Sequence, residues 1–312
     1  MTKRSIRFGV TLPQIKRSWE EASRAAKAFD QLGFDHVWVC DHVYGVPAPQ
    51  IPILEAWSQL AAVAAITERV ELGTLVTPPF LRNPAMLAKQ IATIDQIAGG
   101  RVIAGLGSGW FEAEFVGTGN RFPSLPERQD ALEEQVQIMR MLWEQESSDF
   151  DGKHFRLEAA ACEPKPARRV PILIGGSGEK RLLPMAARYA DIWNNPAGTQ
   201  AELGQKVEAL RKSCDAVGRA FEEVEVSQQC TVVIALESAT AEAALGKASK
   251  IYGDHMGKTI AEHGIWGDPD QVVGHIQRHI DLGCTSFVIE FFGRDTVEPA
   301  QLFAESVMPE FR

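Results

Sequence analysis

Short apolar runs rich in β-branched residues alternate with helical patterns along almost the whole chain. The helical patterns place apolar residues at three- or four-residue spacing, which is typical of helices that pack one face against a sheet. This alternation predicts a parallel sheet built from βα units. Eight such units predict a closed (β/α)8 barrel, the TIM barrel, rather than an open doubly wound sheet. The predicted strands are 6–12, 36–40, 70–76, 102–106, 172–175, 191–194, 224–235 and 286–291.

Glycines and prolines support the same division of the chain. Gly33 and Gly99 follow predicted helices at the position where a left-handed C-cap is favoured. Asp268 followed by Pro269 resembles a helix start with proline at the first helical position. The predicted helices are 19–33, 55–67, 84–98, 127–145 and 179–189.

The simplest domain organisation is one barrel domain over residues 1–312 with two insertions. The first insertion, about 147–169, contains Asp151 and Gly152 between short alternating segments, which predicts a small β-hairpin near Phe155. The second, about 239–268, continues into a further helical pattern. Both insertions are expected to shape the entrance to the substrate pocket.

Composition excludes several function classes. The formal net charge of -9 and pI near 5.4 argue against a nucleic-acid partner, which would need clustered basic residues. The chain has no run of 18 apolar residues and no signal-peptide pattern, so we expect a cytoplasmic protein without a membrane partner. The five cysteines are widely spaced and predict buried reduced thiols, not a metal site. His275 and His279 lack the zincin glutamate between them and predict a solvated helix face.

In a barrel of this kind the chemistry lies where strands end, so residues after each predicted strand are the candidates. Asp41 and His42 follow the second strand. They could orient a cofactor ring and supply an acid or base, because imidazole titrates near neutrality. The alternative is an aspartate that satisfies loop amides beside a half-buried histidine.

The third and fourth strands end in segments suited to a flat ligand. Thr74 to Thr77 would present backbone and hydroxyl groups at the barrel mouth. The glycine-rich segment after the fourth strand is not the dinucleotide-binding pattern, and its small residues would let a flat ring approach the backbone. There Trp110 is a candidate pocket wall, and Glu112 and Glu114 are candidate polar groups. The small residues are Gly107, Ser108 and Gly109.

After the fifth strand come four small residues and a predicted helix. Backbone amides that converge at a helix N-terminus form an anion site, with Lys180 or Arg181 to assist. The sequence is not a Walker A loop, and a plain tight turn is the alternative. The four residues are Gly175, Gly176, Ser177 and Gly178.

Covalent catalysis has no support in the sequence, because there is no G-x-S-x-G elbow and no cysteine has a histidine partner nearby. A glycine-lined mouth with few titratable groups is expected when a cofactor carries the chemistry. A cofactor-free phosphosugar enzyme would need a lysine or glutamate at the strand ends, where Glu290 is the strongest candidate.

Four segments carry a resemblance to a known family: "GFDHVWVCDH", "ERVELGTLVTPPFLRNPAMLAKQIATIDQIAGGRVIAGLGSGW", "ERQDALEEQVQIMRMLW" and "PILIGGSGEKRLLPMAARYADIWN". With them the chain resembles, over nearly its whole length, the bacterial luciferase-like monooxygenase superfamily. The resemblance is to its coenzyme F420-dependent oxidoreductases in particular. It implies a (β/α)8 barrel that holds FMN or its 5-deaza relative at the C-terminal mouth.

The resemblance also implies roles for residues. Asp41 and His42 match the pair beside the cofactor ring, with His42 the candidate catalytic acid or base. Leu75, Val76 and Thr77 match the end of the third strand, where deazaflavin members have a non-proline cis peptide behind the ring. The two glycine-rich segments match the fourth-strand loop and the phosphate-binding loop. The expected substrate pocket residues are Tyr44, Trp110 and Trp193.

The predicted function is that of an oxidoreductase which transfers a hydride between coenzyme F420 and a small apolar or conjugated organic substrate. Trp110 stands where the sugar-phosphate dehydrogenases of the family have a catalytic carboxylate, which argues against glucose 6-phosphate. One alternative is an FMN-dependent monooxygenase, which would need oxygen and a flavin reductase partner. Another is a flavin-binding barrel without turnover. The resemblance also suggests a homodimer.

Overall fold

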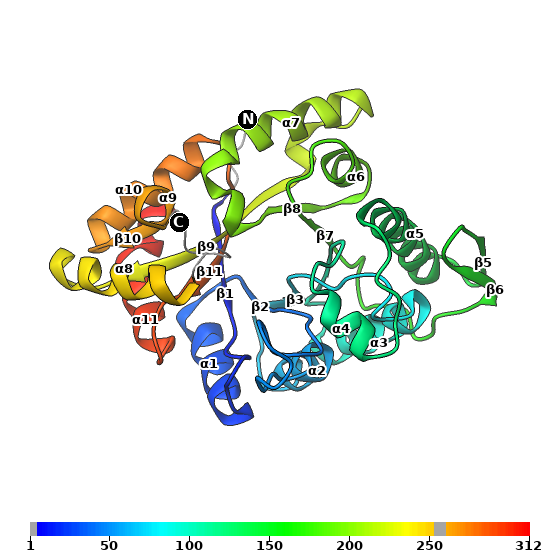
Figure 1. The fold of residues 1–312 in the computed structure, drawn as a ribbon, viewed down its shortest axis with the longest axis horizontal. Helices are drawn as coiled ribbons and strands as arrows, with labels where there is room; N and C mark the ends of the chain where they lie inside the picture. Colours follow the sequence, from blue (N-terminus) through cyan, green and yellow to red (C-terminus); the bar gives the residue numbers. More distant parts are fainter. Residues whose placement is uncertain (1–4, 253–259) are drawn as a thin grey trace.

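The computed structural model describes residues 5–252 and 260–312, and these form a closed barrel of eight parallel strands (Figure 1). Neighbouring strands pair in the order β1-β2-β3-β4-β7-β8-β9-β11, and β11 pairs with β1 to close the ring. The predicted fold is confirmed. The barrel strands are β1 (Arg7–Thr11), β2 (His36–Val39), β3 (Glu71–Thr74), β4 (Val102–Leu106), β7 (Ile172–Gly175), β8 (Ile192–Asn195), β9 (Glu225–Ile234) and β11 (Ser286–Phe291).

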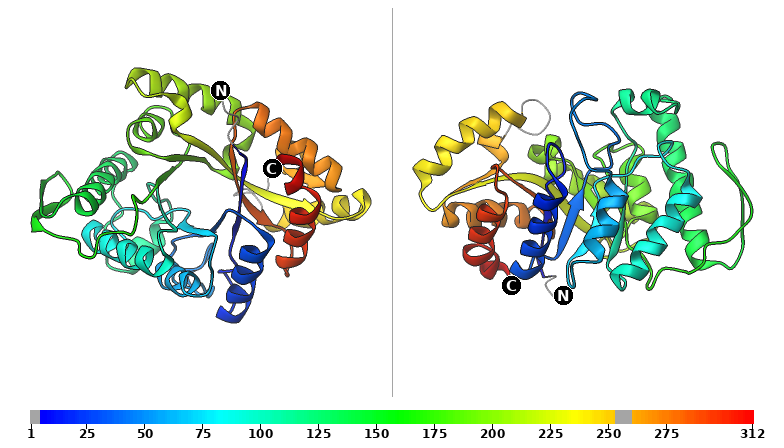
Figure 2. Two further views of the ribbon diagram at one scale, coloured as in Figure 1. Left: turned by 180° about the vertical axis from the view of Figure 1, so that it is seen from behind. Right: turned by 90° about the horizontal axis from the view of Figure 1, so that it is seen from below.

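Helices surround the ring of strands on the outside (Figures 1 and 2). Gly33 and Gly99 adopt the left-handed conformation after α1 and α3, with φ of 83° and 64°, as predicted for C-caps. The helices are α1 (Trp19–Leu32), α2 (Ala56–Ala64), α3 (Pro84–Ala98), α4 (Glu112–Gly117), α5 (Leu125–Glu144), α6 (Leu182–Tyr189), α7 (Leu203–Ala216), α10 (Pro269–Asp281) and α11 (Val297–Ser306), with short 3-10 helices at η1 (Ala197–Glu202), η2 (Phe221–Glu223) and η4 (Met308–Phe311).

Side chains alternate between the two faces of the barrel wall, so one apolar core forms on each face, and a further small cluster lies around α8 (Ser238–Tyr252) and Ile260. The larger core lies between the sheet and the helices. The smaller core fills the barrel, and Leu75 and Val76 pack against it directly after β3 ends. Its buried members are Trp38, Ile103, Leu173, Ile192 and Val288.

Both insertions contain regular structure. The predicted hairpin is present as β5 (Ser148–Asp151) and β6 (Arg156–Ala160), which lie outside the ring beyond α5 (Figure 1). The second insertion contains α8 (Ser238–Tyr252), α9 (Ile260–His263) and β10 (Ile265–Gly267); its residues 253–259 lie outside the described residues. β10, which the sequence analysis did not predict, pairs with β9. Asp268 caps α10 with proline next to it, as expected.

Two expectations about titratable side chains have clear outcomes. All five cysteines are unpaired, and four are buried. The expected solvated face of α10 was wrong for His279, which is 7% exposed, with its Nε2 2.8 Å from the side-chain nitrogen of Gln200. No helix in the described ranges is long and apolar enough to cross a membrane.

Candidate active site

The predicted site residues lie at one end of the barrel. Since all eight strands are parallel, their C-terminal ends share one mouth. Asp41 and His42 follow β2, residues 75–77 follow β3, 107–109 follow β4, and the glycine-rich loop follows β7. In the right-hand view of Figure 2, the blue loop after β2 and the cyan-green segment after β4 lie beyond the same end of the strands.

Three strand ends meet at Val76. A Cβ atom at Gly107 would lie 2.3 Å from Val76 Cγ2, and one at Gly175 would lie 2.9 Å from Val76 Cγ1. Such distances are below any real contact, so only glycine fits at these two positions beside Val76. The Leu75–Val76 peptide bond is cis, the geometry that the resemblance implied.

Asp41 is buried, and its carboxylate is fully engaged by protein groups. Arg82 donates to both oxygens at 2.7 and 2.8 Å, and Trp57 Nε1 and Thr77 Oγ1 donate to Oδ2 at 3.1 and 2.7 Å. The pKa of Arg82 is lowered by burial, but its hydrogen bonds with Asp41 and the carboxylate charges outweigh burial and raise it overall. The Asp41 side chain therefore fixes Thr77 beside Val76 through side-chain donors, not through the loop amides of the alternative considered for this residue.

His42 is held by a carboxylate that the sequence analysis named only as a candidate polar group. His42 Nδ1 lies 3.0 Å from each carboxylate oxygen of Glu114, and the amide of Val43 donates to Oε2 at 3.0 Å. The side chain of Glu114 is 1% exposed and that of His42 is 15% exposed. Among the described residues, none forms a hydrogen bond with His42 Nε2. This geometry leaves Nε2 as the ring nitrogen available at the mouth.

Aromatic rings flank His42. The rings of Trp110 and Phe111 stand edge to face with the imidazole at centroid distances of 5.6 and 6.1 Å. Trp110 is 51% exposed. Tyr44 packs so close to Gly117 at the end of α4 that a Cβ atom there would lie 2.6 Å from its hydroxyl. Tyr44 and Trp110 thus lie on segments next to His42, and their place in a substrate pocket stays a prediction.

Trp193 lies elsewhere, and its assignment to the substrate pocket is corrected. It is fully buried in the outer core, whereas its neighbour Ile192 points into the barrel. Successive strand residues face opposite sides, so Trp193 cannot share the barrel face of Ile192. Its Nε1 donates to the carbonyl of Gly176 at 2.8 Å, which supports the glycine-rich loop from behind.

The glycine-rich loop differs from the prediction at the helix boundary. Helix α6 begins at Leu182 rather than Glu179, after a turn in which Leu182 and Leu183 both donate to the Gly178 carbonyl. Within residues 5–252 and 260–312, the backbone amides of residues 177–181 have no hydrogen-bond acceptor. Arg181 pairs with Asp130 at 2.9 Å and so faces α5. The loop presents free amides, as an anion site requires.

Arg128 is a site residue that the sequence analysis missed. It is 7% exposed, donates to the carbonyls of Ser108 and Pro123, and lies 4.0 Å from the ring centre of Phe122. Burial lowers its pKa, and the charge of Glu112 offsets only part of that effect. No salt bridge joins Arg128 to a carboxylate in the described part of the chain. A buried guanidinium without a carboxylate in direct contact favours an anion nearby.

Two further observations concern what the mouth could hold. Ser108 Oγ is buried and has no hydrogen-bond partner among the described residues. A flat ring that carries an anionic tail fits this set of groups: the Ser108 hydroxyl, the free amides of 177–181, Arg128, and the close approach of Gly107 and Gly175 to Val76, here called the Val76 cradle. Burial raises the pKa of the Cys40 thiol to about 12, with the charges of Glu290 and Asp41 adding to the effect, so a thiolate nucleophile is disfavoured. The described ranges contain no cluster of three metal-ligating side chains.

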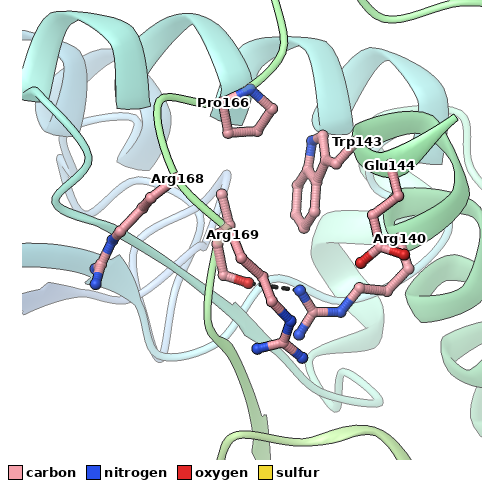
Figure 3. A pocket seen from close by; sticks show the side chains of 7 residues that line it. Arg140, Trp143, Glu144, Pro166, Arg168 and Arg169 are labelled. Carbon is pink, nitrogen blue, oxygen red and sulfur yellow. Dashed lines mark hydrogen bonds between the residues drawn. The ribbon is translucent and has the colours of Figure 1, made fainter. Parts of the chain in front are cut away.

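A cleft of about 280 Å³ near the start of β7 lies apart from the predicted site and is lined by several arginines (Figure 3). Arg140 and Arg169 line it, and both pair with Asp191, at 2.6 and 2.7 Å. Arg168 pairs with Glu71, and its guanidinium points away from the other two in Figure 3. The cleft contains none of the predicted site residues, and its guanidinium groups already have carboxylate partners.

Comparison with known proteins decides the family. The model of the luciferase-like monooxygenase family matches residues 4–286. The chain belongs to this family. An F420-dependent glucose-6-phosphate dehydrogenase of Nakamurella multipartita is 30% identical over 337 residues, covering 100% of this chain and 98% of the relative. A similar enzyme of Amycolatopsis mediterranei is 29% identical over 312 residues, covering 91% and 92%.

A solved structure supports the fold of this luciferase-like protein. An F420-dependent secondary alcohol dehydrogenase in complex with an F420-acetone adduct superposes with a TM-score of 0.85. It is 24% identical and covers 99% of both chains. This superposition confirms the barrel fold, and the family-model match over residues 4–286 confirms the family predicted from the sequence.

Proposed function

We propose that this luciferase-like protein is an oxidoreductase that binds coenzyme F420 at the barrel mouth. It exchanges a hydride between the coenzyme and a small, uncharged apolar or conjugated organic substrate. The observation that carries the proposal is the cradle at Val76, where Gly107 and Gly175 leave room for nothing larger than hydrogen. The relatives at 29 and 30% identity are F420-dependent dehydrogenases, which favours the deazaflavin over FMN.

The residues that would hold the coenzyme divide by chemistry. Leu75 and Val76 would support the flat ring from behind. The amides of residues 177–181, Ser108 Oγ and the Arg128 guanidinium would bind the anionic tail. Among the described residues, the amides and the hydroxyl have no hydrogen-bond partner, and Arg128 forms no salt bridge. When bound, the deazaflavin supplies a carbon that gives or accepts a hydride.

His42 would hold the proton that accompanies hydride transfer. Its Nε2 has no hydrogen-bond partner among the described residues, so it could take a proton from a substrate hydroxyl or return one to a carbonyl oxygen. The rings of Trp110 and Phe111 beside it favour an apolar or conjugated substrate over a sugar phosphate. Trp110 also occupies the position where the sequence analysis expected a catalytic carboxylate in sugar-phosphate dehydrogenases.

Cofactor titration tests the proposal first. Fluorescence titration of the purified protein should show saturable F420 binding that is tighter than FMN binding. Tight FMN binding without F420 binding would instead support the FMN-dependent monooxygenase.

Turnover tests the rival of a flavin-binding barrel without catalysis. With secondary alcohols and ketones as trial substrates, His42→Ala should lower kcat by about 10²- to 10⁴-fold and change F420 affinity only a few-fold. His275→Ala, on the outer helix α10, is the matched control and should keep both values. Binding without turnover in every variant, wild type included, would contradict the catalytic assignment.

Four further expectations stay predictions: one domain over residues 1–312 with insertions at about 147–169 and 239–268, a homodimer, a cytoplasmic location and the absence of a nucleic-acid partner. Sedimentation of the purified protein would test the dimer. A single cooperative unfolding transition would support the one-domain prediction.

A further inference from the structure

Glu114 lies in an unusual position for a carboxylate. Its helix, α4, has six residues, and the neighbouring Phe115 is fully buried, which anchors α4 against the protein. The Glu114 side chain is 1% exposed, and among the described residues its hydrogen-bond partners are His42 Nδ1 and the Val43 amide. A buried carboxylate costs free energy unless donors satisfy it. Both of these partners belong to the segment that carries the proposed acid or base.

The geometry restricts how the proton can be shared. The Val43 amide can only donate, so Glu114 Oε2 must accept from it. An ionised carboxylate is an acceptor only, so His42 Nδ1, at 3.0 Å, must then carry a hydrogen. In the neutral imidazole the other nitrogen, Nε2, is then unprotonated and can accept a proton.

We propose that Glu114 is a positioning residue that holds His42 in the Nδ1–H tautomer, so that Nε2 exchanges the proton with the substrate. The inference rests on the proposed function for the identity of the reaction, but the tautomer itself does not depend on that reaction. If an alcohol were oxidised here with the bound coenzyme as hydride acceptor, the hydroxyl proton of the alcohol would pass to Nε2. The imidazolium formed in this way lies beside the negative charge of Glu114. In the reverse direction Nε2 returns the proton to the carbonyl oxygen.

This role gives Glu114 a signature that a merely structural carboxylate would lack. In Glu114→Gln the amide has both a donor and an acceptor, so it no longer forces hydrogen onto Nδ1. Glu114→Asp keeps the charge on a shorter side chain. Glu158→Gln makes the same chemical change at an exposed position on β6 and serves as the control.

Nitrogen-15 NMR of histidine-labelled protein reads the tautomer directly, with the His42 signals assigned by their loss in His42→Ala. We expect Nδ1–H in the wild type and in Glu158→Gln, and the Nε2–H form or a mixture in Glu114→Gln. Nε2–H in the wild type would overturn the proposal, because Glu114 would then be a protonated donor to Nδ1. An unchanged tautomer in Glu114→Gln would overturn it as well.

Kinetics give the second readout. Glu114→Gln should lower kcat by about 10- to 100-fold while the substrate KM and F420 affinity stay within a few-fold. Glu114→Asp should recover part of that loss. Equal kcat in Glu114→Gln and wild type, with both proteins folded by circular dichroism, would contradict the role. If the wild type shows no turnover with F420 at all, the proposed function fails, and the NMR result still decides the tautomer.

Discussion

The two ends of the barrel differ in the polar groups that they leave without a protein partner, although the mouth also contains the Asp41–Arg82 and His42–Glu114 pairs. At the N-terminal ends of the strands, Arg7 pairs with both Glu71 and Glu225, which begin β3 and β9. At the mouth, Ser108 Oγ, the amides of 177–181 and the Arg128 guanidinium lack such partners in the described part of the chain. The bottom thus resembles a structure optimised for stability, and the mouth one that keeps polar groups ready for a ligand.

The comparison predicts that substitutions at the N-terminal ends of the strands change stability, whereas substitutions at the mouth change coenzyme binding. The largest effect is expected for Arg7→Met, which leaves Glu225 without its cation. Because the pair is partly exposed, we expect the free energy of unfolding to fall by about 2 to 3 kcal/mol, below the range for a fully buried pair. Chemical denaturation measures this change, and kcat should stay within about 2-fold. Arg24→Met removes an exposed arginine and is the control. A loss of activity without a loss of stability would break the comparison.

At the mouth, Gly107→Ala places a methyl group against Val76. One of the two must move, at a cost of about 1 to 3 kcal/mol, so F420 affinity should fall by about 10- to 100-fold. Fluorescence titration measures the affinity. Gly246→Ala, where the added carbon meets nothing within 4 Å, should leave it unchanged. Unchanged affinity in Gly107→Ala would show that the cradle does not hold the coenzyme.

Arg128→Met sharpens the contrast, since it removes a buried cation that has no carboxylate partner. We expect F420 affinity to fall by about 10-fold, while the free energy of unfolding changes by less than about 1 kcal/mol. Calorimetric titration and denaturation measure the two quantities. A large loss of stability with normal affinity would place Arg128 with the structural arginines of the bottom instead.

The smallest expected effect is the loss of folding stability as the pH falls. Burial, with the charge of Arg7 adding to it, holds the pKa of His36 well below its usual range, and burial lowers that of His275 to about 4. The unfolded chain binds these protons near pH 6.5, so stability is present above that pH and is lost as the pH falls toward 4. Each neutral histidine should cost about 0.7 kcal/mol between pH 7 and pH 6. Denaturation at both pH values measures this, and His36→Gln should flatten the slope.

The sequence predicted the eight barrel strands and most helices because apolar periodicity reports burial directly. It missed β10, because a strand of three residues between helices α9 and α10 is too short to show an alternating pattern. It placed the start of α6 too early because Arg181, the N-cap, makes no capping hydrogen bond from its side chain. A long strand shows by its alternating pattern which side of the sheet each residue faces. The four residues of β8 are all buried and show no such pattern, so the sequence did not indicate which side Trp193 faces.

The candidate site was predictable as a set of strand ends, but its pairings were not. Asp41 and His42 are adjacent in sequence, yet one binds Arg82 and the other faces Glu114, 72 residues away. Arg128 reaches the Ser108 carbonyl from a separate helix. Such contacts depend on how loops from different strands pack, and a single sequence has no local signal for that.

Hydrogen exchange with and without F420 tests the central claim most directly, because it compares the two ends of the barrel in one measurement. Addition of the coenzyme should slow exchange at residues 107–109 and 177–181 and leave the N-terminal ends of the strands unchanged. Unchanged exchange at both mouth segments under saturating F420 would contradict the account.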